Sequence, residues 1–233
     1  MVRTSPQPKL VYVAQARHGV TQAQFTTRWR EHAALGMCQA RWRNVAKYLH
    51  CDPVLPEGSA LAGLDVLQAA GIAVVQYRSE AARLAHIADE PARQTMKADE
   101  LSTFAQPVAR TALLTAEHLL KPGVDAAYRL FIFWKSAATG FQDGWLDFGA
   151  GQRITLAQSA SITWAAQNLP VLPKLSRIDG LDADGIDEFA SDDLQGLVEL
   201  ARYWTASCGL SAQASVAFMK AVVLHDLARA PDS

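Results

Sequence analysis

The sequence predicts an α+β protein built from two similar βαββαβ units, and three observations support this prediction. The chain has 233 residues, of which 50% are hydrophobic and 19% charged, as in an ordinary globular protein with a sizeable core. Strand and helix patterns follow one another in the same order in both halves. Four aromatic residues of the first half recur 116 residues later: Tyr12, Phe25, Trp29 and Tyr48 are matched by Tyr128, Phe141, Trp145 and Trp164.

The first half opens with a strand and a helix. Residues 9–18 are rich in β-branched and aromatic side chains, which favour a strand. Thr21 and Gln24 have the spacing of a capping box, so a helix is predicted to start there. Trp29 and His32 lie on one face of that helix.

The remaining elements complete two copies of one pattern. The first half continues with two strands, a long helix and a closing strand, predicted at residues 44–51, from Gly71, at 80–104 and at 109–120. The second half shows the same order less clearly, at residues 126–136, 141–148, 161–167, 185–191, 192–204 and 215–227. The order β-α-β-β-α-β is that of a ferredoxin-like unit.

Pro and Gly within residues 121–125 mark the predicted junction, so the units are expected to span residues 1–122 and 123–233. Each unit alone would leave one apolar sheet face exposed. Packing the two sheets face to face would bury both faces and enclose a cleft or lumen between them. The lumen is therefore the expected place for a ligand.

Two segments resemble motifs of the EthD-domain family. Residues 22–37 (QAQFTTRWREHAALGM) look like the first helix of that family, and Lys47-Tyr48-Leu49 looks like its second strand. The resemblance covers residues 9–120 and, through the repeat, 126–227. It implies a tandem repeat of the domain that forms, within one chain, the barrel of the dimeric α+β barrel superfamily. The chain departs from the motif because Ala34 replaces a proline and His32 follows the aromatic residue by three positions instead of four.

The resemblance implies an architecture and several alternative activities. One is a cofactor-less enzyme of the oxygenase, dehydratase or isomerase class that acts on a small hydrophobic or aromatic metabolite. Another is a non-catalytic accessory protein that holds such a metabolite for an oxygenase system. A haem-binding barrel is a third, with His118 and His225 at repeated positions as ligands. Of these we prefer the first two, and we expect no cofactor and no metal.

Three residues of the first half are candidates for catalysis. Imidazole titrates near neutral pH, so His32 suits a general acid or base. Tyr48 and His50 lie two residues apart on a strand and therefore point to the same face, where they would line the lumen. The structural alternatives are that His32 hydrogen-bonds a neighbouring strand and that His50 lies at the surface. Phe148 stands where the second half would carry a second His32.

Four further residues are candidates for binding the substrate: Trp29, His18, Tyr12 and Trp164. Tyr12 and His18 share a face of the first predicted strand. Trp164 matches Tyr48 in the repeat. The alternatives are core packing for Trp29 and a loop edge for His18.

Composition argues against several classes of protein. The formal net charge of −1 lacks the basic excess of nucleic-acid or membrane-surface proteins, and no apolar run approaches the ~18 residues of a membrane helix. Three cysteines with no CxxC spacing indicate neither a disulfide framework nor a structural zinc site. We therefore expect a cytoplasmic protein whose partner is a small hydrophobic molecule, with a homo-oligomer left open. The first unit carries a net charge of +4 and the second −5, which favours their mutual packing.

Overall fold

The described part of the chain forms a closed antiparallel barrel flanked by helices. The computed structural model describes residues 3–4, 7–171 and 180–227. Eight strands follow one another in the order β6-β2-β5-β3-β10-β7-β9-β8, and the barrel closes where β8 pairs with β6. These strands are β2 (Lys9–Ala14), β3 (Val45–Pro53), β5 (Gly71–Tyr77), β6 (Ala112–Lys121), β7 (Tyr128–Lys135), β8 (Ile162–Pro170), β9 (Gly185–Ser191) and β10 (Gln213–Asp226). Two short strands, β1 (Arg3–Thr4) and β4 (Asp65–Val66), pair with β6 and β10.

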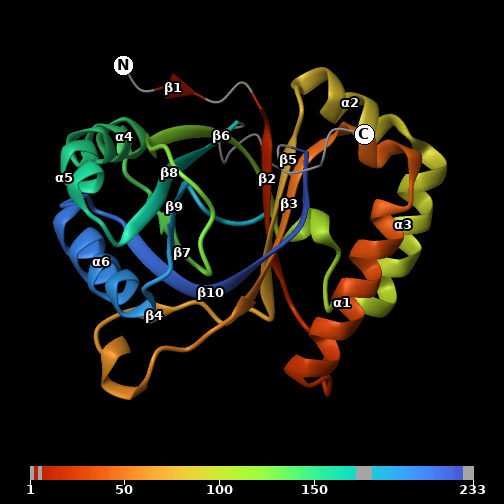
Figure 1. The fold of residues 1–233 in the computed structure, drawn as a ribbon, viewed down its shortest axis with the longest axis horizontal. Helices are drawn as coiled ribbons and strands as arrows, with labels where there is room; N and C mark the ends of the chain where they lie inside the picture. The colour runs from red at the N-terminus through yellow and green to blue at the C-terminus, as the bar shows by residue number, and fades with distance from the viewer. Residues whose placement is uncertain (1–2, 5–6, 172–179, 228–233) are drawn as a thin grey trace.

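The helices lie on two opposite sides of the barrel. Figure 1 shows α1, α2 and α3 on one side and α4, α5 and α6 on the other. Their bounds are α1 (Gln22–Met37), α2 (Glu80–Ala88), α3 (Glu90–Thr103), α4 (Phe141–Gly151), α5 (Arg153–Gln158) and α6 (Leu194–Ser207). Among the described residues, no helix is long and apolar enough to cross a membrane.

Each half of the chain supplies four neighbouring barrel strands. The first half gives β6-β2-β5-β3 and the second gives β10-β7-β9-β8. The two sheets are hydrogen-bonded to each other along both edges, at β3–β10 and β6–β8. The sequence predicted that the sheets pack face to face, but not that their edges are joined. Joining the edges satisfies N–H and C=O groups that would otherwise be exposed. The interior is therefore enclosed by one continuous sheet.

Local signals in the sequence placed the helix starts well. The capping box of Thr21 and Gln24 is present at the start of α1, as predicted. The predicted helix over 80–104 is instead two helices that meet at Asp89. The Asp89 side chain accepts a hydrogen bond from the backbone of Ala92, and Pro91 lies in the first turn of α3. A proline lacks the N–H that a continuous helix needs, so one helix ends and a new helix begins there.

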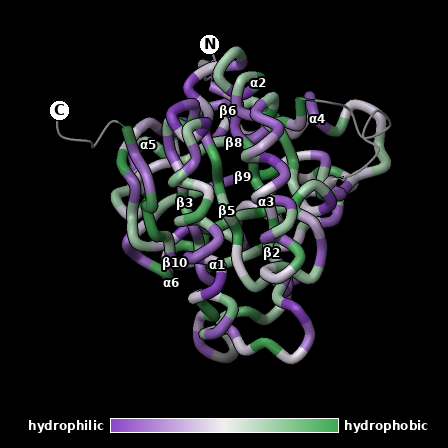
Figure 2. Tube along the Cα trace, turned by 90° about the vertical axis from the view of Figure 1, so that its right-hand side faces the viewer, coloured by the Kyte–Doolittle hydropathy of each residue, from purple (hydrophilic) through white to green (hydrophobic). Residues whose placement is uncertain are grey.

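The strands separate three cores. A helix-facing core lies under each set of helices, and a third core fills part of the barrel interior with residues from both halves, including Val11, Val13, Leu49, Cys51 and Phe131. In Figure 2 the hydrophobic colour runs along central strands such as β5. Side chains thus occupy part of the lumen expected from the sequence.

The register of the strands changes one of the repeat matches. β3 and β8 each contain an irregularity just after their first residue, between Val45 and Lys47 and between Ile162 and Trp164. Trp164 therefore occupies the place that Lys47 has in the first half, and Ala165 the place of Tyr48. The match between Tyr48 and Trp164 was wrong by one residue, which moves the side chain to the opposite face of the sheet.

Candidate functional site

The structure brings four of the predicted site residues together in one buried network. The indole Nε1–H of Trp29 donates to Tyr12 Oη over 3.1 Å, and the hydroxyls of Tyr12 and Tyr48 are 3.2 Å apart. Tyr48 Oη lies 2.5 Å from Nε2 of His50. All four side chains are almost completely buried.

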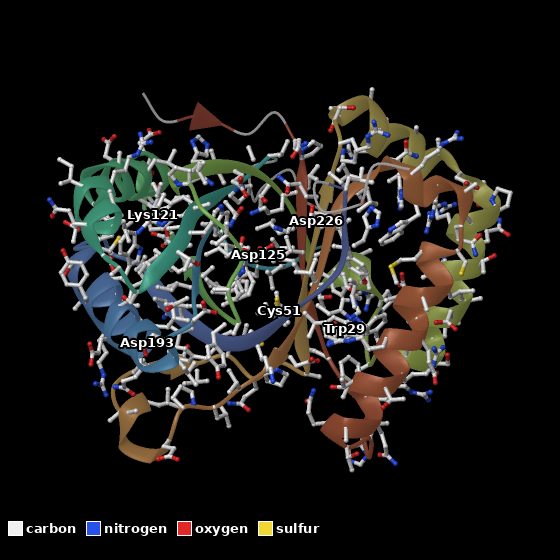
Figure 3. All side chains as sticks on the ribbon, in the orientation of Figure 1. Trp29, Cys51, Lys121, Asp125, Asp193 and Asp226 are labelled. Carbon is white, nitrogen blue, oxygen red and sulfur yellow. The ribbon has the colours of Figure 1, made fainter. Side chains whose placement is uncertain are left out.

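This network faces the helices and not the lumen. From the sequence, Tyr12, Tyr48 and His50 are expected to line the space between the sheets. Neighbouring side chains on a strand point to opposite faces, and here Val11 and Leu49 take the inward positions. Figure 3 shows Trp29 on the side of α1, whereas Cys51 lies centrally.

His50 is held in one protonation state. Its ring stacks on Trp29 with centroids 3.7 Å apart, and its Nδ1 lies 2.5 Å from Arg30 Nη1, whose guanidinium also pairs with Asp52. Because a guanidinium only donates, Nδ1 must accept and Nε2 must carry the proton toward Tyr48. Burial, reinforced by Arg30, lowers the pKa of His50 to about 2. His50 is therefore a neutral donor near neutral pH.

His32 belongs to a separate histidine–carboxylate pair between α1 and α3. Its Nδ1 lies 2.6 Å from Asp99 Oδ2, and Asp99 also pairs with Arg28 and accepts from Thr103 Oγ1 over 3.3 Å. Burial lowers the pKa of His32, while Asp99 acts in the opposite direction. A carboxylate on Nδ1 orients an imidazole as it does in enzymes that use histidine as a base. The ring edge of His32 meets Phe104, with centroids 5.0 Å apart.

Phe104 also lines a pocket of about 560 Å³. We call it the α3 pocket; it is lined by Arg17, His18, Lys97, Glu100, Leu101, Phe104, Ala105, Gln106 and Pro107. Phe104 also makes edge contacts with Tyr12 and Phe25 at centroid distances of 6.2 Å. One aromatic ring therefore lines the pocket and also contacts both groups of buried polar side chains.

Glu100 is a functional candidate that sequence reasoning missed. Its side chain is half-buried in the wall of the α3 pocket, and Oε2 accepts the backbone N–H of Val108 over 3.2 Å. Burial raises the pKa of Glu100 above its ordinary value. A carboxyl group with a raised pKa in a pocket is a typical proton donor or acceptor. The available signal was its spacing of four residues from Phe104, which puts both on one helix face.

The other predicted residues lie apart. His18 is exposed at the rim of the α3 pocket. Trp164 lies inside the barrel, where Lys9 Nζ is 4.9 Å and Arg129 Cζ 4.7 Å from its ring centre. His225, named above as a haem ligand, has its Nε2 3.2 Å from the carbonyl oxygen of Val45.

Comparison with known proteins shows the fold. No protein-family model matches the chain, and no curated protein matches its sequence. Among solved structures, it is similar to an anthrone oxidase-like protein, with a TM-score of 0.61, 10% identity and 99% of both chains covered. The chain has a dimeric α+β barrel-like fold.

Two further solved structures share this fold. A candidate monooxygenase from Fusobacterium nucleatum aligns with a TM-score of 0.59, 8% identity and 94% of both chains covered. A candidate chlorite dismutase aligns with a TM-score of 0.53, 8% identity, 94% of this chain and 95% of that chain covered. At such identities the similarity concerns architecture, because one fold hosts many activities.

Proposed function

We propose that this protein binds a small hydrophobic or aromatic molecule in the α3 pocket and moves a proton on it without a cofactor. The observation that carries the proposal is the position of Glu100. Its carboxyl group lines a pocket of about 560 Å³ whose other walls include Leu101, Phe104 and Pro107. That volume lies in the range of small-molecule sites, and the walls combine apolar side chains with polar groups, among them a carboxyl group whose pKa is raised.

Within this proposal Glu100 is the catalytic residue, because it lines the pocket directly. His32, Tyr48 and His50 do not line the pocket and act as positioning residues, together with Trp29 and Tyr12. His18 and Lys97 at the rim would contact the polar end of the ligand. Proton transfer next to a carbonyl group, as in an isomerisation or dehydration, is the chemistry that this arrangement favours over an oxygenase reaction.

A non-catalytic role is the second candidate, and one observation favours it. His32 and the Tyr12–Tyr48–His50 network do not line the pocket. An accessory protein that stores or delivers a metabolite needs only the pocket. We also propose that the two halves, residues 1–122 and 123–233, descend from one EthD-like domain. The strand order that the halves share supports this repeat. A cytoplasmic location is part of the same proposal.

The test is a ligand screen with matched variants. Phenols, quinones and aromatic ketones are screened by thermal shift, and hits are incubated with the protein and analysed for turnover. Ala105→Trp, which fills the α3 pocket, should abolish the shift, whereas Glu199→Gln, at an exposed position of α6, should leave it unchanged.

The Glu100→Gln variant separates the two roles. An enzyme should keep its ligand and lose turnover by about 100-fold or more, the usual contribution of a general acid or base. Binding without turnover in the parent protein would support the accessory role. Hits that Ala105→Trp still binds would refute the α3 pocket as the site.

A further inference from the structure

The wall of the α3 pocket carries more positive than negative charge. Its lining includes two cations, Arg17 and Lys97, and one carboxyl group, that of Glu100. An excess of one positive charge remains when Glu100 is ionised, and a larger excess remains when it is protonated. The pocket therefore lacks at least one negative charge.

Neither cation has a carboxylate partner in the part of the chain that the structure describes. There, Arg17 and Lys97 form no ion pair and no side-chain hydrogen bond. Lys97 acts on Glu100 only from a distance: it lowers the pKa of that carboxyl group, whereas burial raises it by more. In contrast, Arg28 on α1 pairs with Asp99 of α3. The two cations of the pocket are thus available to a ligand.

The charged residues come from two segments that meet at the pocket. Arg17 lies between β2 and α1, whereas Lys97 and Glu100 lie in the second half of α3. A backbone bridge between Ala16 and Phe104 holds the first segment against the end of α3. The backbone that carries each cation is therefore fixed, although both side chains are exposed at the rim.

The second half of the chain has no equivalent of the charges on α3. Helices α3 and α6 each begin after an aspartate whose side chain accepts a hydrogen bond from the backbone three residues later. Counted from this aspartate, the positions of Lys97 and Glu100 are taken in α6 by Ala201 and Trp204. These two helices lie on opposite sides of one barrel (Figure 1).

The position of Arg17 is also uncharged in the second half. Ala14 on β2 and Trp134 on β7 each pair with a glycine, and each of these glycines lies against the buried tryptophan of α1 or α4. Three residues further along the chain are Arg17 in the first half and Ala137 in the second. The same arrangement of strands and helices thus forms without these charges, so the fold does not require them.

The excess of positive charge selects among ligands. One carboxylate on the ligand balances the pocket when Glu100 is ionised, whereas a neutral ligand leaves the excess. A phosphate monoester, with about −1.5 to −2 charges at pH 7, would exceed it. A carboxylate also matches the planar fork of donors that Arg17 presents.

We propose that the ligand of the α3 pocket is a hydrophobic or aromatic monocarboxylate, whose carboxylate binds Arg17 and Lys97 at the rim. This inference rests on the proposed function, because it names the ligand class of the same pocket. Repulsion from Glu100 keeps the anionic end of the ligand at the rim. The uncharged part then contacts Leu101 and Phe104 and is the part that reaches Glu100.

Three ligands of similar size and different charge test this inference: benzoate, benzamide and benzylammonium. Each is titrated at neutral pH into ¹⁵N-labelled protein, and the backbone amide signals of Leu101 and Gln106 give the Kd. Benzoate should bind about fivefold more tightly than benzamide, and benzylammonium should bind most weakly. High salt should remove most of this preference, because exposed charges are screened. Binding of benzoate that is no tighter than that of benzamide would overturn the inference.

Variants assign the preference to the two cations. Arg17→Gln and Lys97→Gln should each weaken benzoate binding about threefold and leave benzamide binding unchanged. Glu100→Gln removes a negative charge and should strengthen the binding of benzoate only. Lys220→Gln, at an exposed position of β10, is the matched control and should change neither Kd. A preference for benzoate that survives in the double variant Arg17→Gln/Lys97→Gln would refute the assignment.

Failure of this inference can be told apart from failure of the proposed function. If benzamide binds, Ala105→Trp prevents its binding, and benzoate has no advantage, the pocket is a ligand site and only the charge selection is refuted. If no ligand gives a response that Ala105→Trp removes, both the proposed function and this inference are refuted.

Discussion

Asp187 on β9 offers the sharpest test of the energetics of this structure. Its side chain is fully buried under α4 and α6, and Oδ2 accepts the indole N–H groups of Trp134 and, over 3.0 Å, Trp145. Burial, which the indole donors offset only in part, raises the pKa of Asp187 from 3.8 to about 6. The carboxyl group is thus less stable in its charged form in the folded chain than in the unfolded one.

The size and sign of the effect follow from this difference. Between 3.8 and about 6, at 1.36 kcal/mol per pKa unit, the ionised carboxylate costs about 3 kcal/mol of folding stability. The folded state holds the proton to higher pH than the unfolded state, so this contribution is absent below pH 4, grows as the pH rises toward 6 and is constant above it. Asp187→Asn removes the titration and retains an oxygen for the indoles.

Urea unfolding of the parent and of Asp187→Asn at pH 4 and pH 8 measures this contribution. Relative to the parent, the variant should gain about 3 kcal/mol on going from pH 4 to pH 8. Asp147→Asn, at an exposed position of α4, is the control and should stay within about 0.5 kcal/mol of the parent at both pH values. A difference between Asp187→Asn and the parent that is the same at pH 4 and pH 8 would refute the reasoning.

Two further predictions concern packing and the buried charges. Gly71→Ala should destabilise the protein by at least about 1–3 kcal/mol in urea unfolding, because a Cβ there would collide with the Trp29 ring. Gly185→Ala should be less destabilising, because a Cβ at Gly185 would lie 2.9 Å from the Trp145 ring, which is a milder contact. Lys9→Met should cost about 3–5 kcal/mol because it leaves Glu117 buried without its cation, whereas Glu188 keeps Arg129. Adding Glu117→Gln should therefore recover part of the loss. An unchanged urea midpoint in Lys9→Met would show that the pair is not buried as described.

The sequence predicted which elements form but not which way their side chains face. Helix α1 was found from Thr21, Gln24 and its apolar face, since these signals are local. In β2, by contrast, Val11 and Val13 face the interior while Tyr12 and Ala14 face the helices, and all four are buried. A strand that is apolar on both sides has no alternation from which its inner face can be read. Tyr12, Tyr48 and His50 were assigned to the lumen for this reason.

The sequence likewise did not predict which buried charges pair with one another, although it gave the sign of each charge. The first unit carries a net charge of +4 and the second −5, and in the structure Lys9 and Lys47 of the first pair with Glu188 and Asp125 of the second. Lys9 and Glu188 are 179 residues apart, and only closure of the barrel brings them together. The opposite charges are therefore concentrated where the halves meet, inside the barrel.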